Sequence, residues 1–542
     1  MVTYLGDINQ AEGAGVKQAA EEKQGYWQSR LFDAEGEPDW VEVDTKRVQV
    51  GRVRDFGGYW LGLQMLDKLE LPSFLEQTLP HGQEDIEWYI MSLALVLWRL
   101  CEPSSELHIE EHLYDKSPLG DLLGIPDDKM NDNRLYRSLD NLLPHKSALE
   151  KHLKGRLGEL FDLEYDLLLY DVTSVYFEGE AADNGQAKRG YSRDHRPDCK
   201  QVCIALVVSR EGLPLGYEVF NGNRHDVTTV EDMVTKIESQ YGRSGRIWVM
   251  DRGMLSEDNL EFLQSQKRRY IIGTPKSQLK HFEQELLSTD WEKIREGLEV
   301  KACPSPDGAE TFILCRSEAR AQKEKAIHDR FEKRIEQGLE KIAESCRKRK
   351  QKIGSIERRV GRLLGANTRA AGLFKVEVKE GKSGQVAIAW QKIEDWRQWA
   401  ELSEGYYMLR TNIIDWKPGE LWEAYIQLTQ AETAFRIQKS DLRIRPIWHQ
   451  KENRVKAHIL VCFLTYVLWK MLGQMCKKTG LGNEPRQVFD EISQIKVVDV
   501  VMPTKQGTTI TKRCISQPTK AQSVLLQRLN LQLPQYMKTY QL

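Results

Sequence analysis

Three acidic residues in distant parts of the chain have the chemistry needed to bind divalent metal ions: Asp171, Asp251 and Glu432. Asp171 and Asp251 each follow a short apolar run, LLLY and IWVM, and each precedes a polar or glycine-containing turn. Hard divalent cations prefer carboxylate oxygens, and two ions about 3.5 to 4 Å apart activate an attacking oxygen and stabilise a leaving one. The three carboxylates therefore predict two-metal phosphoryl transfer. That reaction needs no nucleophilic side chain, and the sequence contains neither a G-x-S-x-G motif nor a Walker loop.

Glu432 lies in the stretch YIQLTQAETAFRIQK, residues 425–439, whose apolar residues recur at helical spacing. On one continuous helix Tyr425, Glu432, Arg436 and Lys439 share a face, so basic and aromatic side chains surround the carboxylate. The apolar stripe consists of Leu428, Ala431, Ala434 and Phe435. A charged amphipathic helix in which Glu432 pairs with Arg436 explains the same pattern, so this stretch alone leaves both interpretations open.

The two aspartates belong to segments that the pattern predicts as buried strands. Continuous apolar runs bounded by turn-forming residues are typical of strands covered on both faces. Strands are predicted at residues 167–170, 202–208, 215–220, 247–250 and 269–273, and helices at residues 228–241 and 256–265. This order favours a mixed five-stranded sheet with the first three strands antiparallel. Asp171 and Asp251 then lie side by side at strand ends, and Glu432 comes from a helix packed across the sheet.

Structural roles remain open for each of these residues taken singly. An acidic residue at a strand end often caps the following turn, and this applies to Asp171 and Asp251. Arg193 and Arg196 belong to a polar loop near Asp171, where they either bind phosphate or are simply solvated. His225 in GNRHD either acts in the site or shapes the turn at Gly222.

The segments on either side of this core follow other patterns. Residues 58–160 show helical spacing throughout. Residues 276–409 are not expected to continue the sheet. They contain strand patterns at 291–300, 310–314, 373–378 and 385–389, and a long helical pattern at 327–346. From Arg320 to Arg362 there are 15 Lys or Arg against seven Asp or Glu. Such a helix is either a solvated face or a surface for phosphates.

The composition is that of an ordinary globular protein with room for several domains. The 542 residues are 40% hydrophobic and 29% charged, with a formal charge of −2. Nine cysteines without a C-x-x-C pair fit a reducing cytosol and give no zinc site. Two apolar runs, residues 89–100 and 459–472, are shorter than the roughly 20 residues of a spanning helix. They are expected to be buried core helices, and no membrane partner is expected.

Five motifs in a fixed order make the chain resemble the DDE transposases of bacterial insertion sequences. In one branch of this family the third acid lies in Y-x-x-R-x-x-x-E-x-x-x-x-x-x-K. Tyr425, Glu432 and Lys439 match this motif, whereas Leu428 occupies the Arg position and Arg436 is available on the next turn. The other motifs are D-x-T at Asp171 and Thr173, GYSRDHRPDCKQV at 190–202, GNRHD at 222–226 and DRGM at 251–254. The resemblance covers residues 167–472.

The resemblance implies an α/β fold with a ribonuclease H-like mixed-sheet catalytic core. It implies that Asp171, Asp251 and Glu432 bind two Mg²⁺ ions, with Mn²⁺ able to substitute. The expected reaction is cleavage at terminal inverted repeats and joining of the freed 3′ hydroxyl to target DNA. The candidate contacts to double-stranded DNA are Tyr425, Arg436, Lys439, Arg193, Arg196 and His225. A homodimer on DNA and a cytoplasmic, nucleoid-associated location are also expected.

The expected domain layout follows from the same reasoning. The expected order is a loose N-terminal arm (1–57), a helical DNA-binding domain (58–160), the first part of the core (161–275), a β-containing and helical insertion domain (276–409), the second part of the core (410–475) and a C-terminal region (476–542). Two alternatives stay open: a catalytically inactive DNA-binding protein of the same fold, and a ribonuclease H-like nuclease without strand transfer.

Overall fold

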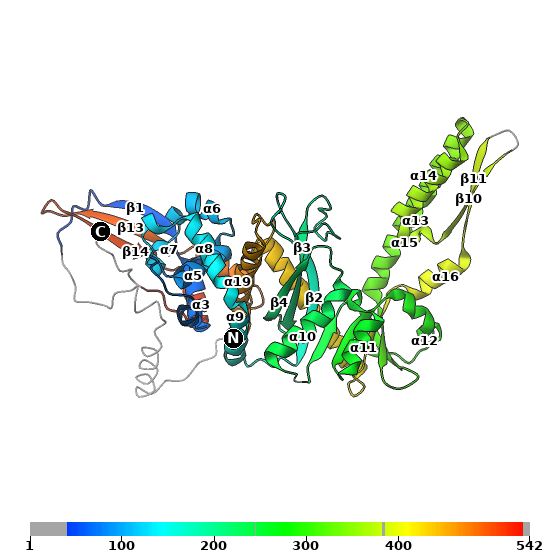
Figure 1. Ribbon diagram of the computed structural model, residues 1–542, viewed down its shortest axis with the longest axis horizontal. Helices are drawn as coiled ribbons and strands as arrows, with labels where there is room; N and C mark the ends of the chain where they lie inside the picture. The colour runs from blue at the N-terminus through cyan, green and yellow to red at the C-terminus, as the bar shows by residue number, and fades with distance from the viewer. Residues whose placement is uncertain (1–40, 244, 382–384, 535–542) are drawn as a thin grey trace. The chain divides into compact units, whose positions relative to one another are not determined.

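A computed structural model of the chain describes residues 41–243, 245–381 and 385–534 (Figure 1). The first 40 residues of the expected N-terminal arm and the last eight of the C-terminal region lie outside the described residues. The chain divides into two compact units, one made of Met1–Arg246 with Leu428–Leu542 and the other of Ile247–Gln427. Both units combine helices with strands, so the predicted α/β class is confirmed.

The first unit begins with a helical region, as the spacing of its apolar residues predicted. After strand β1 (Gln49–Asp55) come α3 (Gly57–Lys68), α4 (Leu71–Thr78), α5 (Trp88–Cys101), α6 (Glu106–His108), η1 (Ile109–Leu113), η2 (Tyr114–Lys116), α7 (Leu119–Leu123), η3 (Asp127–Lys129), α8 (Asp132–Leu142), η4 (Leu143–His145) and α9 (Lys146–Phe161). Helix α5 is apolar on all sides and therefore lies in the core, where it contacts α3, α4 and α8.

The second long apolar helix, α19 (Glu452–Lys478), completes this core by packing against α3, α5 and α8. Among the described residues it is the one helix with the length and composition to span a membrane. Yet 78% of its most apolar stretch is buried inside the protein, as expected of a core helix. The C-terminal part adds α20 (Pro485–Ser493), β13 (Lys496–Pro503), β14 (Thr509–Ile515) and α21 (Lys520–Arg528). Strands β1, β13 and β14 form a small antiparallel sheet that joins distant parts of the sequence.

Three strands of the first unit form an antiparallel sheet in the order β4-β3-β2, as predicted. They are β2 (Leu167–Tyr176), β3 (Gln201–Ser209) and β4 (Pro214–Asn221), followed by η5 (Asp226–Thr229) and α10 (Val230–Tyr241). Every residue of β3 is buried, which explains why its sequence reads as a continuous apolar run. Helix α18 (Thr429–Arg436), which returns to this unit much later in the chain, contacts both β2 and β3.

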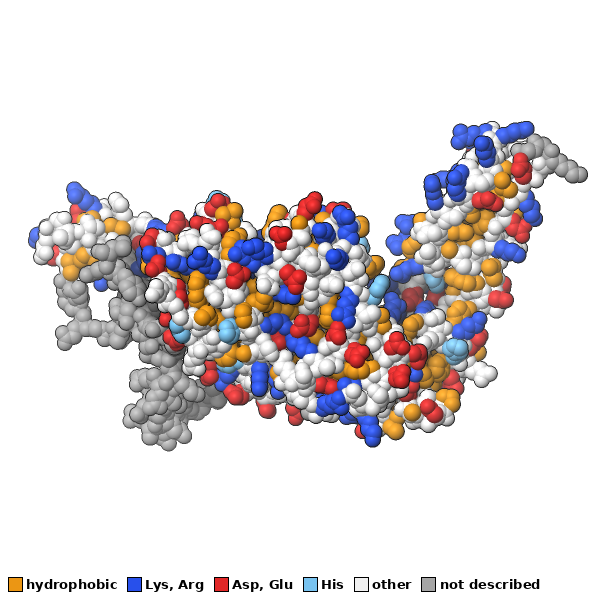
Figure 2. Space-filling view, in the orientation of Figure 1, with side chains coloured by type: hydrophobic (Ala, Val, Ile, Leu, Met, Phe, Trp, Pro, Cys, Tyr) orange, Lys and Arg blue, Asp and Glu red, His pale blue; other side chains and the backbone are white. Residues whose placement is uncertain are grey.

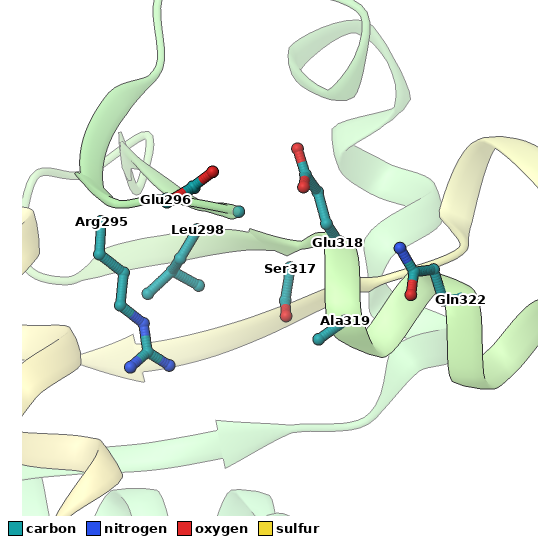
Figure 3. A pocket seen from close by; sticks show the side chains of 8 residues that line it. Arg295, Glu296, Leu298, Ser317, Glu318, Ala319 and Gln322 are labelled. Atoms are coloured by element: carbon teal, nitrogen blue, oxygen red, sulfur yellow. The ribbon is translucent and has the colours of Figure 1, made fainter.

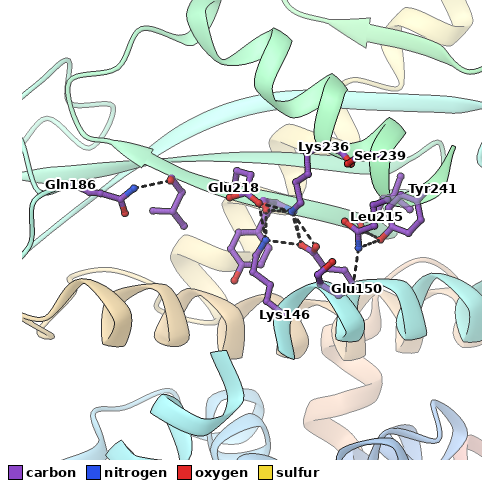
Figure 4. Close-up of polar contacts among 12 residues, drawn as sticks. Lys146, Glu150, Gln186, Leu215, Glu218, Lys236, Ser239 and Tyr241 are labelled. Carbon is purple, nitrogen blue, oxygen red and sulfur yellow. Dashed lines mark hydrogen bonds and ion pairs between the residues drawn. The ribbon is translucent and has the colours of Figure 1, made fainter. Parts of the chain in front are cut away.

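A network of four charged side chains links helices α9 and α10 to strand β4 (Figure 4). Glu150 is buried, and the other three side chains are partly exposed. The Glu150 carboxylate on α9 has no exposed surface and lies 3.1 Å from the amines of both Lys146 and Lys236. The same two amines lie 3.0 and 2.6 Å from Glu218 on β4. Glu150 also accepts a hydrogen bond from the Tyr217 backbone N–H at 3.1 Å. Two positive and two negative side chains thus neutralise one another inside the protein.

Six strands of the second unit pair with one another in the order β5-β6-β12-β9-β8-β7 and are of mixed direction. Strands β5 (Ile247–Met250) and β6 (Arg269–Thr274) are parallel, and the other neighbours are antiparallel. The remaining strands are β7 (Glu292–Arg295), β8 (Leu298–Pro304), β9 (Thr311–Ser317) and β12 (Tyr406–Thr411). The helical elements are η6 (Arg252–Met254), α11 (Glu257–Ser265), η7 (Lys276–Phe282), α12 (Glu283–Leu286), α16 (Glu394–Ser403) and α17 (Pro418–Ile426).

The expectation that residues 276–409 do not continue the sheet is wrong. Strand β12 pairs with β6, and β9, β8 and β7 extend the same sheet from there. The pairing of β6 with β12 brings together residues about 140 apart, such as Gly273 and Leu409, and no local pattern in the sequence reports such a contact.

One part of the second unit forms an arm of its own, with a helical hairpin beside a β-hairpin (Figure 1). It consists of α13 (Glu318–Lys348), α14 (Ile353–Ala366), α15 (Thr368–Ala371) and the antiparallel pair β10 (Phe374–Glu380) and β11 (Val386–Lys392). Here the sequence prediction of a long helix and a separate pair of strands is confirmed. We call α13 to β11, residues 318–392, the arm.

Candidate active site

Asp171 lies in the middle of a strand, and the prediction that it ends one is wrong. Strand β2 continues to Tyr176, and Asp171 is opposite Leu206 in the register with β3. The residues after Asp171 are Val, Thr, Ser and Val, of which Val and Thr are branched at Cβ and favour strands, so pairing with β3 goes on. Asp171 is partly exposed, and Thr173 points to the same face of the strand because side chains alternate.

Glu432 is an exposed residue in the first turn of α18. The apolar stripe predicted for this segment is confirmed, because Ala431, Ala434 and Phe435 are buried. They lie on a helix that contacts β2 and β3, while Glu432 and Arg436 are exposed. Asp171 and Glu432 therefore belong to two elements of the first unit that touch each other.

The single continuous helix predicted over residues 425–439 is wrong. Helix α17 ends at Ile426, α18 starts at Thr429, and a π-helical turn, η8 (Ile437–Asp441), follows. Leu428 occupies the break, is 6% exposed, and its carbonyl accepts hydrogen bonds from the N–H groups of Ala431 and Glu432. An arginine at this buried position would need a counterion, which is a physical reason for the leucine where the motif has Arg.

Lys439 in η8 is held by an acidic residue that the sequence analysis did not single out. Its amine lies 3.0 Å from Asp194 Oδ1, and Arg445 Nε lies 3.2 Å from the same oxygen. Burial lowers the pKa of Lys439, and the Asp194 charge opposes that shift. Asp194 is 4% exposed at its side chain, and its second oxygen has no hydrogen-bond partner among the described residues. Asp194 belongs to the block GYSRDHRPDCKQV. Its place in this block was the one sequence feature that could have pointed to Asp194 as a site residue.

The other basic candidates of the first unit also have acidic neighbours. Arg193 pairs with Asp226, and its backbone N–H donates to Ser174 Oγ on β2 at 3.3 Å. Arg196 lies 3.0 Å from Asp198 and 3.3 Å from Glu178, with its guanidinium over the Tyr176 ring. His225 is exposed and immediately precedes η5. The loop of residues 190–199 thus contacts β2 through a hydrogen bond to Ser174 and through Arg196 over the Tyr176 ring.

In the second unit, Asp251 directly follows β5, as predicted, and is exposed. Tyr425 on α17 belongs to this unit as well. A Cβ added to Gly273 would lie 2.5 Å from the Tyr425 hydroxyl and 3.0 Å from the Arg252 backbone nitrogen, so glycine makes room for the tyrosine. Burial raises the pKa of Tyr425, and the negative charge of Asp251 adds to the shift. Tyr425 therefore interacts electrostatically with Asp251.

The donor atoms at these positions fit a hard divalent cation. Asp171 and Glu432 offer carboxylate oxygens from contacting elements, and both side chains have surface that an ion and its water ligands can reach. Asp251 offers a third, exposed carboxylate immediately after a strand. Carboxylates with access to water are the usual ligands of Mg²⁺, which retains several water molecules when it binds.

Glu106, His449 and His458 form a second cluster of potential metal ligands, all buried in the first unit. His449 Nε2 lies 3.4 Å from Glu106 Oε1. Both ring nitrogens of His458 already have partners: Nδ1 lies 3.3 Å from an Arg99 nitrogen and Nε2 lies 3.2 Å from the Ile444 carbonyl. Since the guanidinium of Arg99 only donates, His458 Nδ1 must accept and Nε2 must carry the proton. This tautomer leaves no lone pair for a metal, so the cluster fits a buried ion pair better than a metal site.

An open pocket lies where α13 begins in the second unit (Figure 3). It is lined by Arg295, Glu296, Gly297, Leu298, Ser317, Glu318, Ala319 and Gln322. None of the predicted site residues lines it, and its charged groups do not form a set that the proposed chemistry requires.

Comparison with known proteins identifies the family. Residues 162–468, more than half of the chain, match the family described as Transposase DDE domain. No curated protein sequence matches the chain. Among solved structures, the chain is similar to a piggyBac transposase synaptic complex with hairpin DNA, at 8% identity and a TM-score of 0.38, over 84% of this chain and 82% of that one. It is also similar to a Mos1 transposase paired-end complex with the left transposon end, at 10% identity and a TM-score of 0.15, over 35% of this chain and 60% of that one.

The family match contains Asp171, Asp251 and Glu432, together with the basic loop and the break before α18. The chain therefore belongs to the family of DDE-domain transposases, whose activity is DNA recombination by transposition.

Proposed function

We propose that the protein is the transposase of an insertion sequence, which cuts the element's ends and joins them to target DNA. The observation that carries this proposal is the family match over residues 162–468, which includes all three predicted acids. Asp171, Asp251 and Glu432 are the proposed ligands of two divalent ions, Mg²⁺ or Mn²⁺. When bound, the ions activate the attacking oxygen and stabilise the leaving one.

The side chains of the protein then have to hold and orient DNA. Arg436 is exposed on α18, one turn beyond Glu432, so it is well placed to contact a phosphate next to the cut bond. Lys439, Arg193 and Arg196 already hold carboxylates, and their proposed DNA contacts require phosphate to share or replace those partners. Tyr425, near Asp251, and His225 are the remaining proposed contacts.

The wider organisation is proposed from the family. The β2, β3 and β4 strands with α18, and the β5 and β6 strands, would form a ribonuclease H-like core that the segment between Asp251 and Glu432 interrupts. The helical region before residue 160 would recognise the terminal inverted repeats. A homodimer acting on two DNA ends in the bacterial cytoplasm would complete the reaction.

The test uses the full-length protein and a supercoiled plasmid that carries the DNA flanking its gene on both sides. We expect nicking in Mg²⁺ or Mn²⁺ and none in EDTA. Asp171→Asn, Asp251→Asn and Glu432→Gln should each lower the nicking rate at least about a hundredfold, because removing one charged ligand weakens stabilisation of the transition state.

Matched controls change an exposed acid near each position. Asp166→Asn precedes β2, Asp258→Asn lies on α11 and Glu423→Gln lies on α17, and all three should keep the wild-type rate. Equal rates for Asp251→Asn and Asp258→Asn would contradict the proposal.

Two alternatives predict different outcomes in the same assay. A DNA-binding protein without catalytic activity binds the plasmid but does not nick it in the presence of metal ions. A nuclease without strand transfer nicks, but it gives no joined product when pre-cut ends and a target plasmid are supplied together. A joined product that depends on Asp251 supports the transposase.

A further inference from the structure

The arm is a self-supporting structure within the second unit. Helix α13 has 31 residues and is therefore about 46 Å long. Ile335, Leu339, Ile342 and Ile356 from the two helices are buried together with Phe374 from the β-hairpin. These contacts give the far half of the arm its own hydrophobic core, so its surface side chains are held in a defined arrangement.

Near the start of α13 the charges of the arm are matched. Glu324 lies 2.7 Å from Lys276 and 2.9 Å from Arg320. One turn or two further on, Glu332 lies 2.5 Å from Lys392 and 2.8 Å from Arg397. Glu324 and Glu332 therefore connect α13 to β11 and to the neighbouring elements η7 and α16 of the second unit.

The other end of the arm, residues 347–362, has no such balance, and we call this segment the tip. It contains eight Lys or Arg and a single acid, Glu357. The side chains of Arg347, Lys348, Arg349, Lys350, Lys352, Arg358 and Arg362 are exposed. Lys348 pairs with Glu344, and no carboxylate of the described residues lies within ion-pair distance of the other six. Figure 2 shows Lys and Arg side chains gathered at this end of the arm.

Helix stability explains only part of this charge. Arg347 and Lys348 lie in the last turn of α13, where cations stabilise the negative end of the helix. Arg349 and Lys350 lie beyond that end, and Arg358 and Arg362 lie in α14, one turn apart on one face. Like charges at this spacing destabilise a helix slightly, so pairing of charges within α14 does not explain Arg358 and Arg362.

The backbone at the tip is fixed by a side chain that turns inward. Arg359 donates hydrogen bonds to Ser345 Oγ at 2.9 Å and to Gln351 Oε1 at 3.2 Å. Gln351 in turn donates to Ser345 Oγ at 2.9 Å. The turn between α13 and α14 is thus closed by hydrogen bonds, and the surrounding basic side chains extend from an ordered base.

The character of the tip fits a polyanion better than a protein. Protein interfaces depend on buried apolar or aromatic anchors. Among the described residues, none of the exposed large hydrophobic side chains belongs to the arm. A surface with many cations and no anchor suits the phosphate backbone of DNA, which carries about one charge per 1.7 Å of helix axis.

We propose that the tip of the arm binds the phosphate backbone of double-stranded DNA independently of base sequence. This inference rests on the proposed function, because transposition supplies the DNA. Exposed Lys and Arg side chains on two helices and a turn form point contacts to phosphates, and phosphate contacts position a protein without reading bases. The tip should therefore strengthen binding to every DNA sequence by the same factor.

The experiment compares two four-fold variants of the full chain by fluorescence anisotropy at several salt concentrations. The tip variant carries Arg349→Gln, Lys350→Gln, Arg358→Gln and Arg362→Gln. The control variant carries Lys280→Gln, Lys293→Gln, Lys512→Gln and Lys520→Gln, which removes the same charge from exposed positions outside the arm. The probes are a duplex from the gene's flanking DNA and a duplex of random sequence.

Each phosphate contact adds about 0.9 to the slope of log K against log salt. We expect the tip variant to lower the magnitude of this slope by about 2 to 4 and to weaken binding at least about tenfold, equally for both duplexes. The control variant should lower the slope by less than about 1. Replacing Arg349, Arg358 and Arg362 by Lys keeps the charge and should keep the wild-type slope.

The outcomes separate this inference from the proposed function. If the tip and control variants give the same slope, or if the tip variant weakens binding to one duplex only, the inference is overturned while the proposed function stands. If the wild-type protein binds neither duplex, the proposed function fails first.

Discussion

The paired charges around Glu150 in the first unit and the mostly unpaired charges of the arm's tip follow opposite rules. Around the buried Glu150 carboxylate two acids and two lysines neutralise one another, and the other three side chains are only partly exposed. At the tip eight basic side chains face one acid, and most of them are exposed. A buried charge without a partner is strongly unfavourable, whereas an exposed one is solvated. Matched charges therefore serve the fold, and unmatched ones remain available for a partner.

The charges around Lys439 lie between these extremes. Lys439 and Arg445 share Asp194, so two cations face one buried acid. This cluster is paired enough to be stable in the protein, yet it keeps a surplus of positive charge on the segment that follows Glu432. Lys439 is therefore both a member of a stabilising ion pair and a proposed contact to a DNA phosphate.

The largest effect on stability is expected from Glu150→Ala. It leaves Lys146 and Lys236 with Glu218 and the Tyr217 carbonyl as acceptors, and it removes the acceptor of the Tyr217 N–H. Breaking such a buried pair lowers the free energy of unfolding by about 3 to 5 kcal/mol. Urea unfolding followed by circular dichroism measures it, with the exposed Glu164→Ala as control. Equal urea midpoints for Glu150→Ala and Glu164→Ala would show that the charge network around Glu150 does not stabilise the fold.

A smaller effect, of about 1 to 3 kcal/mol, is expected for the coupling between Asp194 and Lys439. Asp194→Ala leaves two cations close together, so it should destabilise the protein, and Lys439→Met in the same chain should recover part of the loss. A double-mutant cycle in urea gives the coupling energy, and Asp183→Ala, an exposed acid of the same unit, is the control. Additive effects would mean that the pair contributes nothing.

Acid should weaken the first unit through His458. Burial lowers the pKa of His458, and the charges of Arg99 and His449 add to this, to about 3. The unfolded value is about 6.5, so the unfolded chain binds the extra proton first. Stability is then complete above pH 6.5 and is lost as the pH falls toward 3, by up to about 1.4 kcal/mol per pH unit.

Glu106 acts in the same direction at lower pH. Burial alone would raise its pKa, but the hydrogen bond and charge of His449, with those of His458 and Arg99, lower it to about 2. Urea midpoints between pH 7 and 4 should fall less steeply for His458→Gln than for the wild type, while exposed His281→Gln should follow the wild type. Parallel curves for His458→Gln and the wild type would show that His458 is not the titrating group.

The smallest effect on stability is expected at the tip. The four-fold variant of Arg349, Lys350, Arg358 and Arg362 removes exposed charges only, so the free energy of unfolding should stay within about 0.5 kcal/mol of the wild-type value. A slight gain is compatible with relief of like-charge repulsion in α14. If the four-fold variant lowered the free energy of unfolding as much as Glu150→Ala does, the basic side chains of the tip would be needed for folding and would not be a binding surface.

Local patterns in the sequence predicted the elements well where burial decides the pattern. The apolar runs before Asp171 and Asp251 are strands, and the long basic helix and the hairpin at 373–389 are present. The extension of the sheet through β12 was missed, because strand pairing over about 140 residues leaves no local signal. The break at Leu428 was missed as well, since its sequence keeps helical spacing while the chain passes from one unit to the other.

The local structure around the candidate residues was only partly predictable. Asp251 follows its strand as expected, whereas Asp171 lies within β2, because Val and Thr continue the strand past it. The partner of Lys439 was not predictable, as Asp194 lies 245 residues earlier in the chain. Charge pairs of this kind depend on the tertiary arrangement, and the sequence contains only the residue types.

A Mn²⁺ titration followed by electron paramagnetic resonance tests whether Asp171, Asp251 and Glu432 together bind divalent ions. The full-length protein is bound to the flanking-DNA duplex, and Asp171→Asn, Asp251→Asn and Glu432→Gln are compared with Asp258→Asn. We expect two ions per site for the wild type and Asp258→Asn, and at least about tenfold weaker binding for each of the other three variants. Wild-type binding in all three of those variants would contradict this expectation.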